Sequence, residues 1–229
     1  MVIAGLQKFS LSDFPGVISA IVFTQGCGFR CPYCHNPELV DPSRFAPEIP
    51  LNEVRNFLRS RMGQLQGVVV TGGEPTIHTD LPDFLSELKG MSFAVKLDTN
   101  GTNPRMLQRL VDDGVVDYIA MDIKAPLALY PEIAGAPFES ADLLQSIALI
   151  RHSGLPHEFR TTFVESILSV EDLFETARLV KGCQKYAIQR FRGGRVLEAG
   201  LDAEEMTSGA RLSEIARILT ANGYKVEVR

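Results

Sequence analysis

The chain has 229 residues, of which 45% are hydrophobic and 22% are charged, and its formal net charge is −5. These ordinary values exclude a disordered tail, a collagen-like repeat and a disulfide-rich miniprotein, and the acidic balance argues against a broad nucleic-acid-binding face. Because no apolar run approaches the roughly eighteen residues of a membrane span and no signal peptide pattern is visible, we expect a cytoplasmic protein without nucleic-acid or membrane partners.

Short apolar runs alternate with longer amphipathic stretches along the chain, which is the pattern of parallel strands joined by helices. The expected strands are 17–24, 68–71, 93–98, 118–123, 159–164, 185–191 and a final short strand, 225–228. The expected helices are 51–65, 81–88, 104–113, 142–152, 170–180 and 208–221. This alternation gives about six strand–helix units.

The length then decides between closed and open architectures. A closed barrel of eight units needs about 250 residues, which exceeds the 229 residues of this chain. Six units with a long first loop fit within this length. The pattern therefore predicts an α/β fold, a single-domain partial (β/α)6 TIM-like barrel with parallel strands over residues 1–229, with a doubly wound sheet as the alternative. In either fold, functional residues lie on loops that leave the carboxyl ends of the strands.

The loop after the first expected strand contains three of the four cysteines. Cys27, Cys31 and Cys34 follow the spacing C-x3-C-x2-C within about residues 24–40, whereas Cys183 is far away and is expected to be a small buried residue near a helix end. Three thiolates so close together can converge on one metal cluster, whereas disulfides between them would be geometrically awkward. The sequence therefore predicts a metal site on this loop.

Several kinds of site remain compatible with this spacing. A tetrahedral zinc site could use His35 as its fourth ligand, and the C-x-x-C-H segment also matches covalent haem attachment, which normally requires export. A four-iron cluster held by three cysteines would instead leave one iron open to an exogenous ligand. Purely structural or redox-sensing thiols are the remaining interpretation.

Later strand ends also carry polar residues. Gly72 and Gly73 let a ligand approach the backbone closely, and Glu74 offers a carboxylate to an ammonium group, although a tight turn explains the same residues. Asp98 and Thr99 end the third strand, where a turn cap is the alternative.

Two further strand ends place opposite charges together. Asp122 and Lys124 are two residues apart and therefore point to the same side, where they need either a ligand or each other. Arg160 on the fifth strand suits a carboxylate, with surface exposure as the alternative. For Arg190 and Arg192 we expect partner contact or solvent exposure.

The cysteine motif, with the aromatic Tyr33 before its last cysteine, resembles that of the radical S-adenosylmethionine (SAM) superfamily. Within it, the chain is similar to the glycyl-radical-enzyme activating family, above all to anaerobic ribonucleoside-triphosphate reductase activating proteins, with pyruvate formate-lyase activating enzymes as near relatives. The matching stretches are 13–16, 27–36, 71–75, 98–101, 122–124 and 189–192.

The resemblance implies an iron–sulfur oxidoreductase that reductively cleaves SAM to a 5′-deoxyadenosyl radical. That radical would abstract hydrogen from a glycine of a partner glycyl radical enzyme, above all anaerobic ribonucleotide reductase, with electrons from a reduced flavodoxin or a ferredoxin-type donor. The alternatives are a radical SAM enzyme that acts on a small molecule, as a deazapurine synthase does, and a non-catalytic zinc-binding adaptor.

The resemblance also implies the site residues. Cys27, Cys31 and Cys34 would hold one [4Fe-4S] cluster. SAM would contact Tyr33, His35, Gly72, Gly73, Glu74, Asp98, Thr99, Asp122, Lys124 and Arg160, with the Gly-Gly-Glu stretch on its amino group and Arg160 beside Lys124 on its carboxylate. Asp98, Thr99 and Asp122 match positions that hold a monovalent cation in relatives. Relatives also have a cofactor-contacting His on the sixth strand, but this chain has no His after His157.

Overall fold

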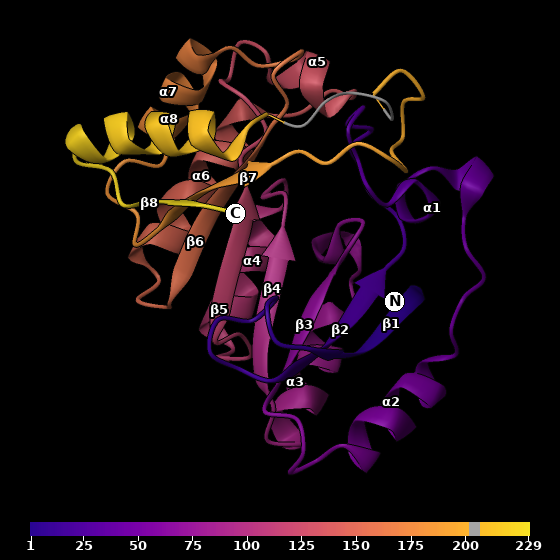
Figure 1. The fold of residues 1–229 in the computed structure, drawn as a ribbon. Coiled ribbons are helices and arrows are strands. Elements are labelled where there is room, and N and C mark those ends of the chain that lie inside the picture. Colours follow the sequence, from indigo (N-terminus) through magenta and orange to yellow (C-terminus); the bar gives the residue numbers. More distant parts are fainter. Residues whose placement is uncertain (202–206) are drawn as a thin grey trace.

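The computed structural model describes residues 1–201 and 207–229, and all strands found there form one sheet (Figure 1). The strands are β1 Ile3–Ser10, β2 Ser19–Thr24, β3 Gly67–Gly72, β4 Ala94–Thr99, β5 Tyr118–Asp122, β6 His157–Phe163, β7 Tyr186–Arg190 and β8 Val226–Val228. Their order in the sheet is their order in the sequence. β1 pairs with β2 in antiparallel fashion, and every later pair is parallel.

Helices connect the parallel strands. They are α1 Pro37–Val40, α2 Leu51–Ser60, α3 Leu81–Gly90, α4 Pro104–Asp112, α5 Tyr130–Ala134, α6 Ser140–His152, α7 Val170–Leu179 and α8 Gly209–Ala221. Local sequence fixes several of their starts. Asn103 and Ser208 cap α4 and α8, and Ser169 forms a capping box with Asp172 at the start of α7.

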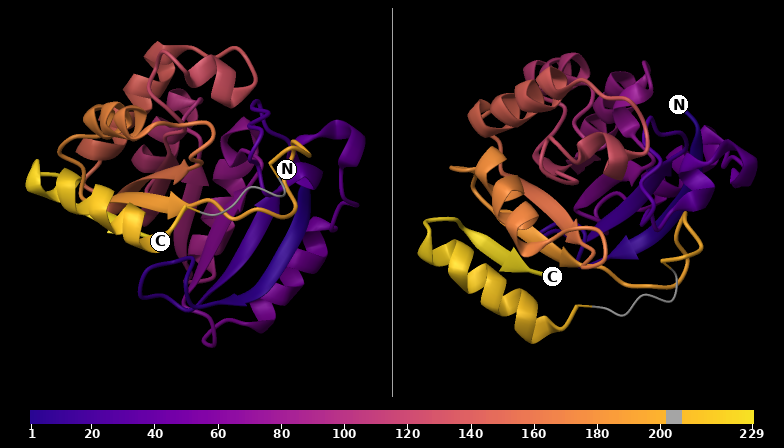
Figure 2. Two further views of the ribbon diagram at one scale, coloured as in Figure 1. Left: turned by 45° about the horizontal axis from the view of Figure 1, so that its top comes forward. Right: turned by 90° about the horizontal axis from the view of Figure 1, so that it is seen from above.

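The arrangement is a partial barrel, as the sequence predicts. Sequential parallel strands joined by right-handed crossovers carry their helices on one face, and Figure 2 shows helices along the outer side of the curved sheet. The sheet begins at β1 and ends at β8 without pairing between those two strands, so the barrel stays open.

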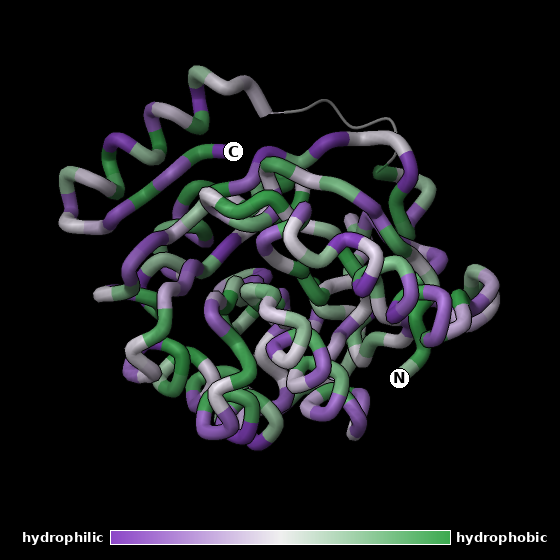
Figure 3. The backbone as a smooth tube through the Cα atoms, turned by 90° about the horizontal axis from the view of Figure 1, so that it is seen from below, coloured by the Kyte–Doolittle hydropathy of each residue, from purple (hydrophilic) through white to green (hydrophobic). Residues whose placement is uncertain are grey.

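The core lies between the sheet and these helices. β2, β3, β4 and β5 are almost wholly buried, with Val68 and Val70 on β3 fully covered. Helices contribute one face each, and in Figure 3 hydrophobic and hydrophilic residues alternate along α8 beside the C-terminus. Leu212, Ile215 and Leu219 form the buried face of α8. No helix in the described parts of the chain is long and apolar enough to cross a membrane.

The sequence pattern missed β1 and the short helices α1 and α5. β1 lies at the edge of the sheet and is buried mainly at its two ends, so its residues show no clear alternation of polar and apolar types. The expected helix 51–65 also ends early, at Ser60, and its last residues form turns that lead into β3.

Candidate functional site

A cavity of about 240 Å³ lies at the carboxyl ends of the parallel strands. The loop after β2 forms one side, and the ends of β3, β4 and β5 with parts of β6 and β7 complete the wall. The sequence-predicted residues that line it are Cys27, Cys31, Tyr33, Cys34, His35, Gly72, Gly73, Asp98, Thr99, Asp122, Lys124 and Arg160. Glu74 is the exception among the predicted set.

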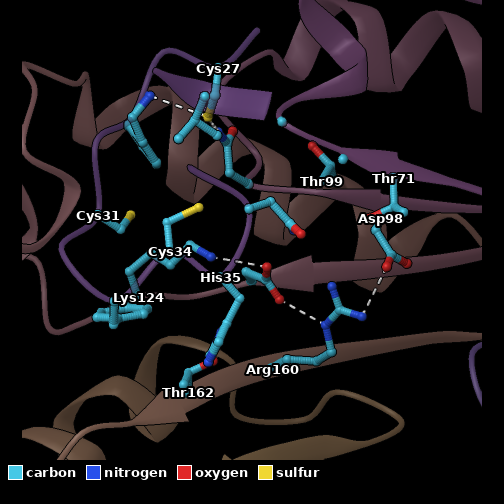
Figure 4. A pocket seen from close by; sticks show the side chains of 18 of the residues that line it. Cys27, Cys31, Cys34, His35, Thr71, Asp98, Thr99, Lys124, Arg160 and Thr162 are labelled. Carbon is cyan, nitrogen blue, oxygen red and sulfur yellow. Dashed lines mark hydrogen bonds and ion pairs between the residues drawn. The ribbon is translucent and has the colours of Figure 1, made fainter. Parts of the chain in front are cut away.

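The three clustered cysteines are free thiols on one side of the cavity, opposite Asp98 and Thr99 (Figure 4). Among residues 1–201 and 207–229, no three Cys, His, Asp or Glu side chains converge where a single metal ion could bind. Three separate thiols around one space fit a multi-atom iron–sulfur cluster with one iron left open.

Distant segments hold the cysteine loop in shape. The backbone N–H of Arg30 donates to the carbonyl of Ala134 at 2.7 Å, at the end of α5, and the N–H of Glu198 donates to the carbonyl of Pro32 at 3.0 Å. His35 Nε2 donates to the carbonyl of Arg192 at 2.7 Å, so this nitrogen carries the proton. The loop is therefore held by segments that follow β5 and β7 in the second half of the chain.

Burial favours the neutral form of all three thiols. It raises the pKa of Cys27 to about 12, with a smaller contribution from the negative charge of Glu74, and raises the pKa of Cys31 to about 11. The pKa of Cys34 is raised by burial as well. Because iron binds the thiolate, loading of a cluster here must displace protons.

The two glycines at the end of β3 pack against the start of the cysteine loop. A Cβ on Gly73 would lie 2.0 Å from the carbonyl oxygen of Gly26, and one on Gly72 would lie 2.4 Å from the backbone of Thr24. Gly72 also has a φ of +120°, a conformation that favours glycine. These glycines are thus required by the chain's own backbone packing, in addition to any approach by a ligand.

Glu74 does not line the cavity, and its carboxylate is surrounded by hydrogen-bond donors. It is completely buried, and its Oε1 accepts from the backbone N–H of Thr76 at 3.0 Å and from the hydroxyls of Thr76 and Thr99 at 2.6 and 2.8 Å. Oε2 accepts from the backbone N–H of Asn100 at 2.6 Å. Burial raises the pKa of Glu74, and these hydrogen bonds oppose the rise. The carboxylate oxygens are thus held by the protein's own donors, and contact with a ligand ammonium group stays a prediction.

Asn100 is a site residue that the sequence reasoning passed over. Its side-chain N–H donates toward Cys27 Sγ at 3.8 Å, while its Oδ1 accepts from the backbone and hydroxyl of Thr102. An Asn-Gly pair is typical of a turn, and Asn100 does form an Asx turn with the backbone N–H of Thr102. Its contact with the thiol depends on the fold, as do the cavity positions of Thr162 and Gln189.

Opposite charges meet where β4, β5 and β6 end. Lys124 Nζ donates to Asp122 Oδ2 at 3.0 Å, which confirms that these side chains share one side. Arg160 Nε donates to Asp122 Oδ1 at 2.7 Å, and Arg160 Nη1 donates to Asp98 Oδ2 at 3.1 Å. Figure 4 shows the guanidinium group of Arg160 directed toward Asp98.

These contacts keep every member of the group charged. Burial alone would raise the pKa of each aspartate, but the cations outweigh it, so the pKa of Asp98 is lowered and that of Asp122 is lowered strongly. Burial would lower the pKa of Lys124, but Asp122 raises it well above its ordinary value. Lys124 and Arg160 thus remain cationic at the cavity wall, where they could bind an anionic group such as a carboxylate.

Tyr33 lines the same cavity and is buried. Its hydroxyl has no hydrogen-bond partner among the parts of the chain that the structure describes. Cys183 lies elsewhere, buried in the main hydrophobic core after α7, and is absent from the cavity wall.

The chain is similar in sequence to a known protein family and to several of its characterised or described members. The family model of the radical SAM superfamily matches residues 21–180. A protein of Methanocaldococcus jannaschii described as a "putative glycyl-radical enzyme activating enzyme" is 30% identical over 94% of this chain and 90% of its own length. The pyruvate formate-lyase-activating enzyme of Staphylococcus aureus is 34% identical over 52% of this chain and 51% of that enzyme.

A solved structure shares the fold. SuiB of Streptococcus suis, bound to S-adenosylmethionine, aligns with 91% of this chain at a TM-score of 0.69 and 13% identity. This chain spans about half, 51%, of the SuiB chain. At that identity the likeness concerns the fold alone.

Proposed function

The chain belongs to the radical SAM superfamily, and on that premise we propose that it activates a glycyl radical enzyme, specifically an anaerobic ribonucleoside-triphosphate reductase. It is a radical SAM enzyme, and its cofactors are a [4Fe-4S] cluster and SAM. The observation that carries the activase proposal is the similarity to the archaeal protein, which extends over nearly the whole of both chains. The match to a pyruvate formate-lyase-activating enzyme supports the same class of target.

We assign the cluster to Cys27, Cys31 and Cys34. Their three thiolates would bind three irons, and the donor set provides no fourth cysteine at the cavity wall. When bound and reduced, the cluster supplies the electron that cleaves SAM to methionine and the 5′-deoxyadenosyl radical, which abstracts hydrogen from the target. The protein contributes the shape of the loop, because Ala134 and Arg192 fix it through hydrogen bonds.

The remaining cavity residues would orient SAM. Lys124 and Arg160 would bind its carboxylate by charge-assisted hydrogen bonds, each held in place by Asp122. The backbone of Gly72 and Gly73 would face its amino group, and Tyr33 and His35 would contact the rest of the molecule. Glu74 would act as a positioning residue, since it ties the cavity residue Thr99 to the end of β3.

The open side of the barrel suits a macromolecular substrate. A glycine of a partner must reach the radical, and the cavity lies at the carboxyl ends of the parallel strands in a barrel that does not close between β1 and β8. A protein loop is therefore our preferred substrate, with a reduced flavodoxin or ferredoxin-type protein as the electron donor. The chain itself, over residues 1–229, would act as one radical SAM domain.

The decisive experiment mixes the anaerobically reconstituted protein, reductant and SAM with a candidate anaerobic ribonucleotide reductase. We expect a glycyl-radical signal in the reductase by electron paramagnetic resonance, together with 5′-deoxyadenosine. A reductase whose target glycine is replaced by alanine should give no such signal. Turnover of a small molecule without any partner would instead support the deazapurine-synthase-like alternative. Purified protein that contains zinc but neither iron nor sulfide would contradict both.

A further inference from the structure

Asp98 and Asp122 have every carboxylate oxygen in contact with a cationic side chain. Arg160 bridges one oxygen of each, and Lys124 contacts the second oxygen of Asp122. The second oxygen of Asp98 lies 2.5 Å from the ammonium nitrogen of Lys96. The result is an unbroken row of alternating charges: Lys96, Asp98, Arg160, Asp122 and Lys124.

Lys96 is the member of this row that, with its buried side chain, does not line the cavity. Its side chain is only 2% exposed, and its ammonium group also lies 5.9 Å from the centre of the Tyr118 ring. Lys96 and Asp98 are two residues apart on β4, so they point to the same side of the strand. A buried ammonium group is costly without a partner, and Asp98 is the carboxylate it contacts.

The family resemblance leads us to expect an inorganic monovalent cation at Asp98, Thr99 and Asp122, but the donor set does not fit one. Three cationic side chains contact all four oxygens of the two carboxylates, so the group carries a net charge of +1 before SAM binds and has no negative charge left over for a further cation once the SAM carboxylate is added. The hydroxyl of Thr99 donates to Glu74 and accepts from the N–H of Gly101.

We propose that the ammonium group of Lys96 takes the place of this inorganic cation. Lys96 is then a positioning residue, which neutralises Asp98 from behind and directs its other oxygen to Arg160. Arg160 in turn presents its guanidinium group at the cavity wall, where SAM would place its carboxylate. The inference rests on the proposed SAM position but is independent of the identity of any glycyl radical partner.

The first test measures whether the wild-type holoenzyme binds or needs a monovalent cation. Thallium(I) nitrate is the probe, followed by ²⁰⁵Tl nuclear magnetic resonance with SAM present, and SAM cleavage is compared in potassium, sodium and choline salts of equal ionic strength. We expect no saturable thallium binding and less than a twofold difference in rate. Saturable thallium binding that potassium displaces, or activation by potassium of tenfold or more, would overturn the proposal.

The second test removes the charge. Lys96→Met should leave one oxygen of Asp98 without a cationic partner. Thallium binding should then appear, and potassium should improve SAM affinity by tenfold or more. Lys96→Arg keeps the positive charge and should behave as wild type. Lys89→Met is the matched control, because it breaks a partly exposed ion pair with Asp117 away from the cavity. A folded Lys96→Met protein whose SAM affinity does not depend on potassium would refute the proposal that Lys96 stands in for an inorganic cation.

Should Lys96→Met fail to fold, the wild-type and Lys96→Arg measurements still decide the question. Neither readout requires a partner protein, so a failed activase proposal would leave this result unaffected.

Discussion

Glu74 accepts a 2.6 Å hydrogen bond from the backbone N–H of Asn100, so a carboxylate at the end of β3 fixes the turn that follows β4. Because Glu74 is completely buried, the negative charge is compensated only by the donors around it. The contact joins the glycine-rich turn to the residue whose amide faces Cys27. It explains how a residue outside the cavity wall can control the shape of that wall.

Replacement of the Glu74 carboxylate should lower the stability of the folded protein. Glu74→Gln puts an amide N–H₂ against hydrogen-bond donors, and we expect the free energy of unfolding to fall by about 2–3 kcal/mol. Glu87→Gln is the control, since Glu87 pairs with Arg55 at the surface and should cost less than about 1 kcal/mol. Urea unfolding of both variants measures the difference, and equal losses would contradict the role assigned to Glu74.

Substitution of a proposed cluster ligand should impair cluster binding, whereas substitution of the core cysteine Cys183 should not. Cys27→Ala should leave the protein with incomplete iron and sulfide after anaerobic reconstitution and lower SAM cleavage by at least about a hundredfold, since one of three proposed ligands is gone. Cys183→Ala should retain both iron content and cleavage, because Cys183 lies in the apolar core. Iron analysis and 5′-deoxyadenosine formation are the readouts. Wild-type cleavage by Cys27→Ala would refute the ligand assignment.

Close packing of the glycine turn against the cysteine loop gives a further prediction. Gly73→Ala places a methyl group 2.0 Å from the Gly26 carbonyl, so the two loops must separate, at a cost of about 1–3 kcal/mol in the free energy of unfolding. Gly28→Ala, on the same loop but with open space around its Cβ, should change stability by less than about 0.5 kcal/mol. Denaturant unfolding compares them, and equal effects would show that the contact is dispensable.

The amide of Asn100 should tune the proposed cluster. Its contact with Cys27 Sγ favours extra negative charge on the sulfur, so Asn100→Ala should lower the reduction potential by about 40 mV, the equivalent of roughly 1 kcal/mol for one electron. Thr102→Val serves as the control, because it loses a hydrogen bond within the same turn but keeps the amide beside the sulfur. Redox titration would measure both, and an unchanged potential in Asn100→Ala would exclude this influence.

The aspartates should make the fold sensitive to acid. In the folded protein the pKa values of Asp98 and Asp122 lie below their ordinary value near 3.8, because the surrounding cations outweigh burial. The ionised pair therefore contributes stability above about pH 4, and that contribution is lost as the pH falls through the lowered values. Asp122→Asn should have a lower free energy of unfolding at pH 6 and should lose less of it between about pH 5 and about pH 2, the range in which the wild-type carboxylate takes up its proton. A slope equal to that of wild type would contradict this origin.

The sequence could predict what depends on local periodicity and spacing. Each parallel strand appears in the apolar runs, and the two-residue spacing of Asp122 and Lys124 correctly placed both side chains together. The cavity wall follows from the rule that strand ends meet at one edge of the sheet, which needs no knowledge of side-chain contacts.

What the sequence could not predict depends on three-dimensional neighbours. Nothing in the Gly-Gly-Glu stretch shows that Glu74 contacts Thr99 and Asn100, because those donors come from the end of another strand, β4. The two-residue spacing places Lys96 beside Asp98, as it does Lys124 beside Asp122, but the bridge that Arg160 forms between the two aspartates comes from another strand and is visible only in the structure. The edge strand β1 was not predicted because its partial burial leaves no regular alternation of polar and apolar residues in the sequence.

The anchoring of the cysteine loop has a consequence for how the protein matures. The loop receives hydrogen bonds that involve Ala134, Arg192 and Glu198, all synthesised long after Cys34. A nascent chain that has released only its first three strands therefore has the thiols but not the contacts that shape them. We therefore expect the cysteine loop to reach its final shape only after the barrel has folded past β7, since the residues that anchor it follow β5 and β7 in the chain.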